Sequence, residues 1–220
     1  MYVPLLKTNK TMKKILFIAL LAVFAASTAS AQDTRKVKDT WEKTITVPNS
    51  QATIIEKLFT AWGKEFPGSF VDAFNKFKKT GKADKITVSE KEGVESCVMD
   101  FNVDLAPKNG YLEMYEKVEN GARLTAVYWN LQNGNKLFGI FLNDSFFCDD
   151  SEEITILYEK ALMFYEYDAT KGTMTPRPEI SQKVLSVADY PRLPKEGRDI
   201  EYWDNKTNSN QKLKWNGNGF

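Results

Sequence analysis

The chain contains no histidine among its 220 residues. This absence excludes His-dependent catalytic triads, histidine general bases and most catalytic zinc sites, because all of them use an imidazole. It also excludes a pH switch based on histidine. Any catalytic mechanism would therefore have to use carboxylates, lysines or tyrosines as its acids and bases.

Cysteine is scarce, with Cys97 and Cys148 as the only two. In an exported protein an even number of cysteines is typical of a disulfide, so a Cys97–Cys148 bridge is one interpretation. The other is two separate buried thiols, since free cysteine is among the most buried residue types. Neither thiol is expected to be a catalytic nucleophile, because histidine, the usual activating base, is absent.

Residues 12–31 have the pattern of a secretory signal. Two lysines form a basic head, residues 15–26 form an apolar centre, and Ala29-Ser30-Ala31 forms a cleavage box. The apolar centre is shorter than the ~20 residues that a transmembrane helix needs, so we expect no membrane span in the processed protein. We predict an exported protein that is periplasmic, held at the cell surface or released, and we expect translation to begin at Met12.

Removal of residues 1–31 changes the charge of the protein. The segment contains four lysines and no acidic residue, so its loss changes the net charge from +1 to −3. Residues 32–220 are enough for one domain with a substantial core. A weakly acidic chain with well-mixed charges is not expected to bind nucleic acid.

Two short amphipathic helices are predicted near the start of the processed chain. Apolar residues recur with helical spacing over 54–62, and Asn49 or Ser50 can cap this helix. Ser69 can cap a second helix, which carries three phenylalanines at helical spacing and ends at Gly81. The short connection between them predicts a helical hairpin.

An antiparallel β-meander is predicted next. Between residues 94 and 105 apolar and polar side chains alternate, as in a strand with one buried face. Three Asn-Gly pairs follow between apolar runs, and this dipeptide accepts the positive φ angles of tight hairpin turns. The predicted strands are 94–105, 111–118, 122–131 and 136–142, and the turns contain Asn109-Gly110, Asn120-Gly121 and Asn133-Gly134.

The pattern is less regular in the last third of the chain. Residues 154–161 fit both a helix and a strand, and we favour a strand because the aromatic-rich stretch 162–167 follows. Beyond Pro176 the chain is punctuated by prolines and ends in two short β-like runs, 200–203 and 212–215.

Together these elements predict an α+β fold. An N-terminal helical hairpin would pack on an antiparallel β-meander, which a Pro-rich C-terminal β segment would extend. We divide the processed chain into a flexible N-terminus (32–45), an α+β domain (46–176) and a C-terminal β appendage of the same globular unit (177–220).

Several short motifs resemble those of a group of exported proteins of anaerobic Gram-negative bacteria whose activity is unknown. The motifs are Tyr128-Trp129-Asn130 with Asn133-Gly134-Asn135-Lys136-Leu137, Phe164-Tyr165-Glu166-Tyr167-Asp168 with Met174-Thr175-Pro176, Leu193-Pro194-Lys195-Glu196-Gly197-Arg198-Asp199-Ile200, and Leu213-Lys214-Trp215-Asn216-Gly217. The resemblance implies a periplasmic or surface location, and it implies no functional residue.

Carboxylates on one predicted strand suggest a hydrolase. Asp100 and Asp104 lie on the same face of the 94–105 strand. A carboxylate pair ~5 to 10 Å apart can hydrolyse a glycoside, but four residues along a strand span ~13 Å. Either aspartate would need a partner such as Glu113 on the next strand, so Asp100 and Glu113 are our candidate catalytic residues. The simpler interpretation is a solvated sheet face.

An acidic loop between residues 144 and 153 could hold a metal ion. Its carboxylates are hard oxygen ligands of the kind that calcium takes, and Asp144, Asp149 and Asp150 are the candidates. The loop lacks the spacing of a calcium-binding motif, and a solvated loop is the simpler interpretation. We expect no cofactor.

Aromatic residues are the main candidates for ligand binding. Tyr128 and Trp129 are adjacent on one strand, as are Tyr202 and Trp203, so one member of each pair points away from the surface that the other packs against. Trp215 joins them if the terminal hairpin forms. Outward aromatic rings suit sugars or a protein partner. The alternative is that the helices and the C-terminal segment cover both faces of the sheet.

The function expected from these observations is non-catalytic binding outside the cytoplasm, with a glycan or a protein as the ligand. One alternative is a carboxylate-dependent hydrolase of glycans or peptidoglycan fragments. Another is a structural component of the cell envelope.

Overall fold

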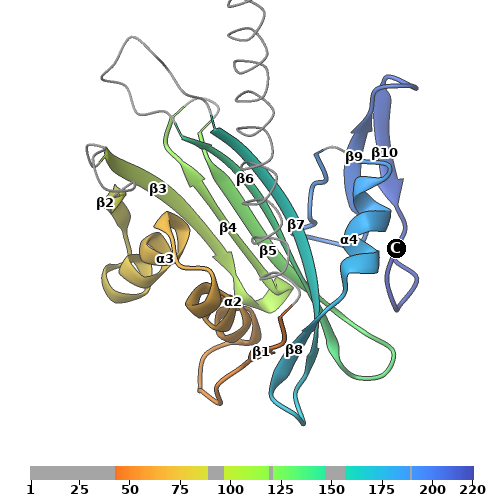
Figure 1. Ribbon diagram of the computed structural model, residues 1–220, viewed down its shortest axis with the longest axis horizontal. Helices are drawn as coiled ribbons and strands as arrows, with labels where there is room; N and C mark the ends of the chain where they lie inside the picture. The colour runs from red at the N-terminus through yellow and green to blue at the C-terminus, as the bar shows by residue number, and fades with distance from the viewer. Residues whose placement is uncertain (1–42, 89–96, 119–120, 147–156, 189) are drawn as a thin grey trace, which may run out of the picture. The chain divides into compact units, whose positions relative to one another are not determined.

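The computed structural model describes residues 43–220 except for 89–96, 119–120, 147–156 and 189. The chain divides into two units, residues 1–42 and residues 43–220, and the second unit is described below (Figure 1). The signal segment lies outside the described residues. The predicted flexible stretch 32–45 ends in strand β1, where Ile45 is buried and pairs with Met174.

A large antiparallel sheet dominates the described part of the chain. Its eight strands have the order β1-β8-β7-β6-β5-β4-β3-β2, so β2 to β8 are neighbours in sequence order. The strands are β1 (Ile45–Thr46), β2 (Ala83–Val88), β3 (Cys97–Ala106), β4 (Tyr111–Glu116), β5 (Arg123–Asn130), β6 (Lys136–Phe146), β7 (Leu157–Asp168) and β8 (Thr173–Pro176). With its helices, this sheet confirms the predicted α+β fold with an antiparallel sheet.

The four predicted strands correspond to β3, β4, β5 and β6, and β6 continues to Phe146 instead of ending at 142. The turn at Asn109-Gly110 follows a short 3-10 helix, Pro107–Asn109, and Gly110 adopts the left-handed conformation with φ 67°. Residues 157–161 belong to strand β7, so the helical alternative for 154–161 is not adopted there. Residues 154–156 lie outside the described residues.

Two helices, α2 (Ile54–Glu65) and α3 (Ser69–Thr80), precede β2. Gly81 ends α3 in the left-handed conformation, as predicted. The helix starts differ from prediction. Thr53 and not Asn49 or Ser50 is the N-cap of α2, and Ser69 is the first residue of α3 and not its cap. Glu56, three residues after Thr53, completes a capping box, a pattern that marks this helix start in the sequence.

Glu56 also ties the two helices together. Its carboxylate accepts hydrogen bonds from the Thr53 backbone N–H at 2.9 Å and from the Lys78 ammonium of α3. Burial opposes ionisation of Glu56, but the hydrogen bonds from Lys78 and Thr53 outweigh it and lower its pKa. Apolar contacts add to this link, since the rings of Phe59 and Phe74 lie 4.9 Å apart.

The two faces of the sheet have different partners. On one face Phe101 packs against Phe70 of α3, with ring centroids 5.2 Å apart, and the pairing register places Leu112 and Met114 of β4 on this side. The other face carries Tyr111, Val127, Trp129 and Phe164, which belong to a core cluster with the C-terminal segment. The helices and the C-terminal segment therefore cover opposite faces (Figure 1).

Helix α4 (Pro178–Leu185) lies in the region that was predicted to be a β appendage, so that prediction was incomplete. Its buried residues Ile180 and Val184, with Ala188 beyond its end, follow one another at intervals of four. Pro178 does not disrupt the helix, because the first helical position needs no backbone N–H. The rest of the segment forms the hairpin β9 (Ile200–Asp204) and β10 (Ser209–Leu213), close to the two predicted runs.

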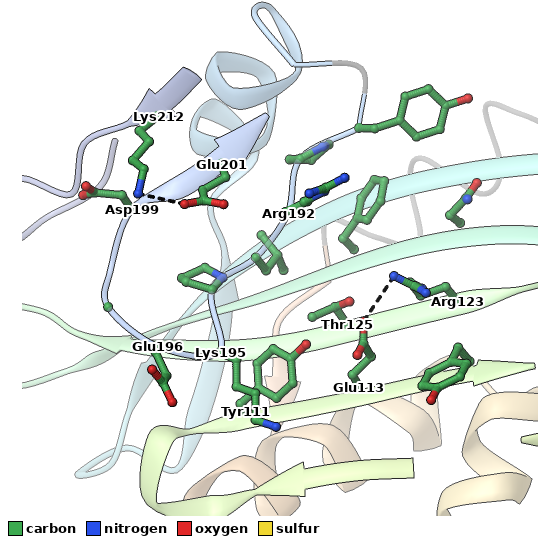
Figure 2. Close-up of a pocket in the computed structure, with 18 of the residues that line it drawn as sticks. Tyr111, Glu113, Arg123, Thr125, Arg192, Lys195, Glu196, Asp199, Glu201 and Lys212 are labelled. Carbon is green, nitrogen blue, oxygen red and sulfur yellow. Dashed lines mark ion pairs between the residues drawn. The ribbon is translucent and has the colours of Figure 1, made fainter. Parts of the chain in front are cut away.

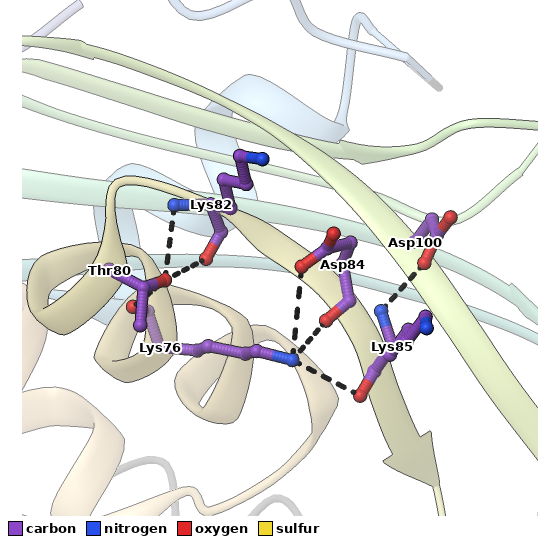
Figure 3. A network of polar contacts seen from close by, with 6 residues as sticks. All are labelled: Lys76, Thr80, Lys82, Asp84, Lys85 and Asp100. Atoms are coloured by element: carbon purple, nitrogen blue, oxygen red, sulfur yellow. Dashed lines mark hydrogen bonds and ion pairs between the residues drawn. The ribbon is translucent and has the colours of Figure 1, made fainter.

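The edge of the sheet at β2 is irregular (Figure 3). Lys85 has a positive φ of 53°, and the pairing register with β3 shifts between Ala83 and Ile86. Asp100 of β3 accepts a hydrogen bond from the Lys85 backbone N–H at 2.6 Å, and the Lys76 ammonium binds the Asp84 and Lys85 carbonyl oxygens. A bulge and a lysine at an edge both discourage the addition of another strand.

Candidate functional site

The candidate site is a groove of about 850 Å³ on the sheet face opposite α2 and α3. Side chains of β4, β5 and β6 form its first wall, and the chain segment 190–199 with one residue each from β9 and β10 forms its second wall (Figure 2). We refer to this cavity as the groove. It is large enough for a drug-sized or oligosaccharide ligand.

The sheet wall places polar and aromatic side chains side by side. Glu113 of β4 pairs with Thr125 of β5, and Tyr115 pairs with Arg123, so all four point to one face. The Arg123 Nη1 lies 3.6 Å from the Glu113 Oε1, and its guanidinium lies over the Tyr115 ring at 5.4 Å from the centroid. This wall belongs to β4 and β5, which pair with neighbouring strands on both sides.

Tyr111 completes the sheet wall. Its pKa is raised strongly, first by burial and then by the nearby charges of Glu113 and Asp104. Tyr111 therefore remains a neutral hydrogen-bonding group at physiological pH. The Lys195 ammonium lies 5.9 Å from the centroid of its ring.

The 190–199 segment is fastened at three points. Arg192 forms a β-bridge with Glu201, through hydrogen bonds of 2.7 and 3.2 Å. The Lys195 ammonium forms an ion pair with Asp104 of β3 at 2.5 Å. The Trp129 Nε1 donates a hydrogen bond to the Arg198 carbonyl oxygen at 2.9 Å. The segment is therefore held over the sheet without regular secondary structure of its own.

The carboxylates of the second wall also have cationic partners. Glu201 pairs with Lys212 at 2.7 Å, which lowers the pKa of Glu201. Asp199 pairs with Lys214 at 2.8 Å and accepts the Trp215 backbone N–H, and both contacts lower its pKa. These acids are ionised and neutralised at neutral pH.

Of the two aspartates considered as partners of Glu113, the structure places Asp104 and not Asp100 beside it. Asp100 lies near the edge of the sheet, where it binds the Lys85 backbone. Glu113 instead has Asp104 as its direct cross-strand neighbour. Directly opposite residues place their Cβ atoms ~5 Å apart, so Asp104 lies beside Glu113, which lines the groove. Lys195 and Arg123 lie beside them as counter-ions.

The candidate ligand-binding aromatics lie in three different places. Trp129 is buried, and Tyr202 and Trp215 pack partly buried against the same core cluster. Tyr128 is half-buried on the sheet face of the helices, and its ring lies where a side chain at Gly110 would otherwise be. Trp203 is 50% exposed, on β9 outside the groove.

The remaining site predictions lie beyond what the structure describes. Cys148, Asp149 and Asp150 are outside the described residues, as is the side chain of Asp144, and only the backbone of Cys97 is described. Within the described ranges, no three His, Cys, Asp or Glu side chains come together as a metal site.

Sequence reasoning missed the residues that form the second wall. Arg192, Lys195 and Arg198 occur within eight residues that also contain two prolines and a glycine. Binding residues are common in charge-rich loops that contain prolines, so this composition could have marked the segment as a candidate site. The position of the segment over β4 and β5 could not be deduced from the sequence, because it depends on contacts with residues that are far away in the chain.

No helix in the described part of the chain is long and apolar enough to cross a membrane. Comparison with known proteins gives no match: no family model fits the chain, and no curated protein or solved structure is significantly similar to it.

Proposed function

We propose that the protein is an exported, non-catalytic binding protein whose ligand occupies the groove. The observation that carries this proposal is the groove itself, a cavity of about 850 Å³ between the sheet and the 190–199 segment. Aromatic rings and charges of both signs line it, which suits a polar ligand with flat faces. Export rests on the signal pattern of residues 12–31 and on the resemblance to exported bacterial proteins.

Each part of the fold would contribute to this binding site. The helical hairpin of α2 and α3 would support the sheet from behind. The Pro-rich C-terminal appendage would form the outer wall of the site. The prolines on both sides of Arg192 and Leu193 restrict the backbone of this wall, which reduces the entropy lost when a ligand binds.

Binding is favoured over catalysis by the partners of the carboxylates. Asp104 forms an ion pair with Lys195 at 2.5 Å, and the Glu113 Oε1 lies 3.6 Å from the Arg123 Nη1. Each carboxylate therefore has a cationic neighbour, and the oxygens that remain can accept hydrogen bonds from the hydroxyl groups of a ligand.

A screen of ligands by thermal shift, followed by calorimetry, tests the proposal. Neutral glycans, acidic glycans and peptides would be added to the wild-type chain, and a ligand that binds the folded state should raise the melting temperature. The Tyr115→Ala variant, which removes a ring from the groove, should bind the hit more weakly. The matched control is Trp203→Ala, which removes an exposed ring outside the groove.

Two outcomes would contradict this proposal. Loss of binding in Trp203→Ala with normal binding in Tyr115→Ala would place the site on β9 and not in the groove. Failure of every ligand class to bind would favour the alternative of a structural envelope component.

A carboxylate-dependent hydrolase is the second candidate, because Asp104 and Glu113 are direct cross-strand neighbours on the sheet face that carries the groove. Release of reducing ends from oligosaccharides or peptidoglycan fragments would support it. That activity should then disappear in Glu113→Gln and in Asp104→Asn, while Asp100→Asn retains it, because Asp100 lies away from this pair.

A further inference from the structure

The groove is lined by five cationic and five anionic side chains, and they are not all paired with one another. Glu113, Asp199 and Glu201 each face a cation, as described above. By contrast, Arg192 and Arg198 form no ion pair with any side chain in the described part of the chain, although both line the groove. Two further carboxylates, Glu116 and Glu196, also line it.

Those two carboxylates form no ion pair with the arginines within the described residues. Glu116 accepts a hydrogen bond from the Ala122 backbone N–H at 3.3 Å, which directs it to the connection between β4 and β5. Glu196 is exposed, as are Arg192 and Arg198, and the pKa of Glu201 is lowered by Lys212 and also by the charge of Arg192. The guanidinium groups of Arg192 and Arg198 therefore have hydrogen-bond donors available to a ligand, in a groove that has no net positive charge.

Arg192 is positioned for an anion. The β-bridge to Glu201 fixes its backbone, and its neighbours Pro191 and Leu193 are buried. Figure 2 shows that the Arg192 side chain extends from the second wall into the groove, while the Arg123 side chain extends into it from the sheet wall. The 3.6 Å contact between Arg123 and Glu113 is longer than a hydrogen bond, so Arg123 has donors that remain available.

We propose that the ligand of the groove is an acidic glycan, and that a carboxylate, sulfate or phosphate group on it binds between Arg192 and Arg123. A guanidinium matches the geometry of such oxyanions and binds them through two parallel hydrogen bonds. This inference rests on the proposed function, since it identifies the chemical class of the ligand for the same groove.

The remaining lining favours a sugar over an acidic peptide. Hydroxyl groups both donate and accept hydrogen bonds, so they match carboxylates such as Glu113 as well as cations such as Arg198. An acidic peptide carries several carboxylates close together, and Glu113 and Glu196 would repel those that do not reach an arginine. A glycan carries its oxyanions among neutral hydroxyl groups.

A matched pair of trisaccharides tests the inference. Trigalacturonate and the neutral trisaccharide of galactose differ mainly in a carboxylate against a hydroxymethyl group on each ring. Titration calorimetry on the full chain at low salt should show that trigalacturonate, or a sulfated or phosphorylated glycan of similar length, binds roughly tenfold or more tightly than the neutral sugar. This preference should decrease as salt is added.

Arg192→Gln should weaken binding of the acidic sugar by roughly tenfold or more and leave binding of the neutral sugar unchanged. Lys206→Gln is the matched control, because it removes one positive charge from the exposed β9–β10 turn outside the groove. It should bind like the wild type. Equal melting temperatures of the unliganded variants would show that Arg192→Gln is folded.

Three results would overturn the inference. If neutral and acidic sugars bind equally and Arg192→Gln has no effect, the ligand class is wrong while the proposed function stands. If a poly-glutamate peptide binds more tightly than every glycan, the ligand is an acidic peptide. If no carboxylated, sulfated or phosphorylated glycan binds, the inference fails, and the wider ligand screen decides separately whether the proposed function fails with it.

Discussion

The indole rings of Trp129 and Trp215 lie 5.8 Å apart and are inclined by only 20°. Trp129 belongs to the centre of the sheet and Trp215 to the end of the chain, so this contact attaches the C-terminal segment to the sheet. Phe220 completes the cluster, with ring centroids 5.2 Å from both tryptophans. The outer wall of the groove therefore depends on aromatic packing below it.

Replacement of Trp129 should destabilise the fold. Trp129→Ala removes the ring and its hydrogen bond to the Arg198 carbonyl, and we expect a loss of about 3 to 5 kcal/mol in the free energy of unfolding, measured with urea. Trp203→Ala removes an exposed indole and should change this free energy by no more than about 0.5 kcal/mol. Equal losses in the two variants would show that the Trp129 cluster does not hold the segment.

Gly139 should not tolerate a side chain. A Cβ atom at this position would lie 2.7 Å from Phe164 Cε1 and 3.0 Å from Trp129 Cζ3, in a buried part of the sheet. Gly139→Ala should therefore destabilise the protein by about 1 to 3 kcal/mol, as overpacking does. If the clash with the Phe164 ring is the cause, Phe164→Leu should lower the free energy of unfolding less in the Gly139→Ala variant than in the wild type. Additive losses in a double-mutant cycle would contradict this explanation.

Glu166 should make stability depend on pH. Its carboxylate accepts hydrogen bonds from the side-chain amides of Asn135 at 2.8 Å and Asn133 at 2.9 Å, and it forms an ion pair with Arg177 at 2.5 Å. Glu166 therefore joins the β5–β6 turn to the start of α4. The pKa of Glu166 is lowered, mainly by the hydrogen bond from Asn135 and further by the hydrogen bond from Asn133 and the charge of Arg177. Burial acts in the opposite direction but is outweighed. Glu166→Gln should cost about 1 to 3 kcal/mol at pH 7.

The sign of the pH effect follows from that lowered pKa. The stabilisation by Glu166 is complete above its ordinary pKa of 4.5 and is lost as the pH falls through the lower value of the folded state. The difference in unfolding free energy between wild type and Glu166→Gln should therefore decrease below pH 4.5. Glu179→Gln, which removes a more exposed partner of Arg177, should show a smaller difference at every pH.

Lys85 offers a substitution that stabilises the protein. Its φ of 53° is costly for a residue with a Cβ atom, by about 1 to 2 kcal/mol, and glycine avoids this cost. Glycine also increases the conformational entropy of the unfolded chain, which lowers stability by about 0.5 to 1 kcal/mol. Lys85→Gly should therefore raise the free energy of unfolding by up to about 1 kcal/mol. Lys82→Gly, at a neighbouring position without positive φ, should lose stability in the same urea titration. A loss in both would show that Lys85 is not strained.

Local periodicity was enough to predict much of the sheet and both N-terminal helices. The alternation in 97–105 and the Asn-Gly pairs depend on side-chain patterns within a few residues, and the strands they predict are present. Helix α4 was missed because its apolar stripe has only Ile180 and Val184 within the helix and lies among prolines. The caps of α2 and α3 were displaced by a few residues, as is usual for helix ends.

By itself the sequence determined the α+β class, the direction of neighbouring strands and the exclusion of histidine chemistry, because composition and short-range patterns suffice for these. Only the tertiary structure decided that Glu113 faces Asp104 and not Asp100, that Trp129 is buried and Trp203 exposed, and that the 190–199 segment closes a groove. These relationships join residues up to 91 positions apart, as Asp104 and Lys195 are. They depend on strand register and on which sheet face the C-terminal segment covers, and no local pattern encodes either.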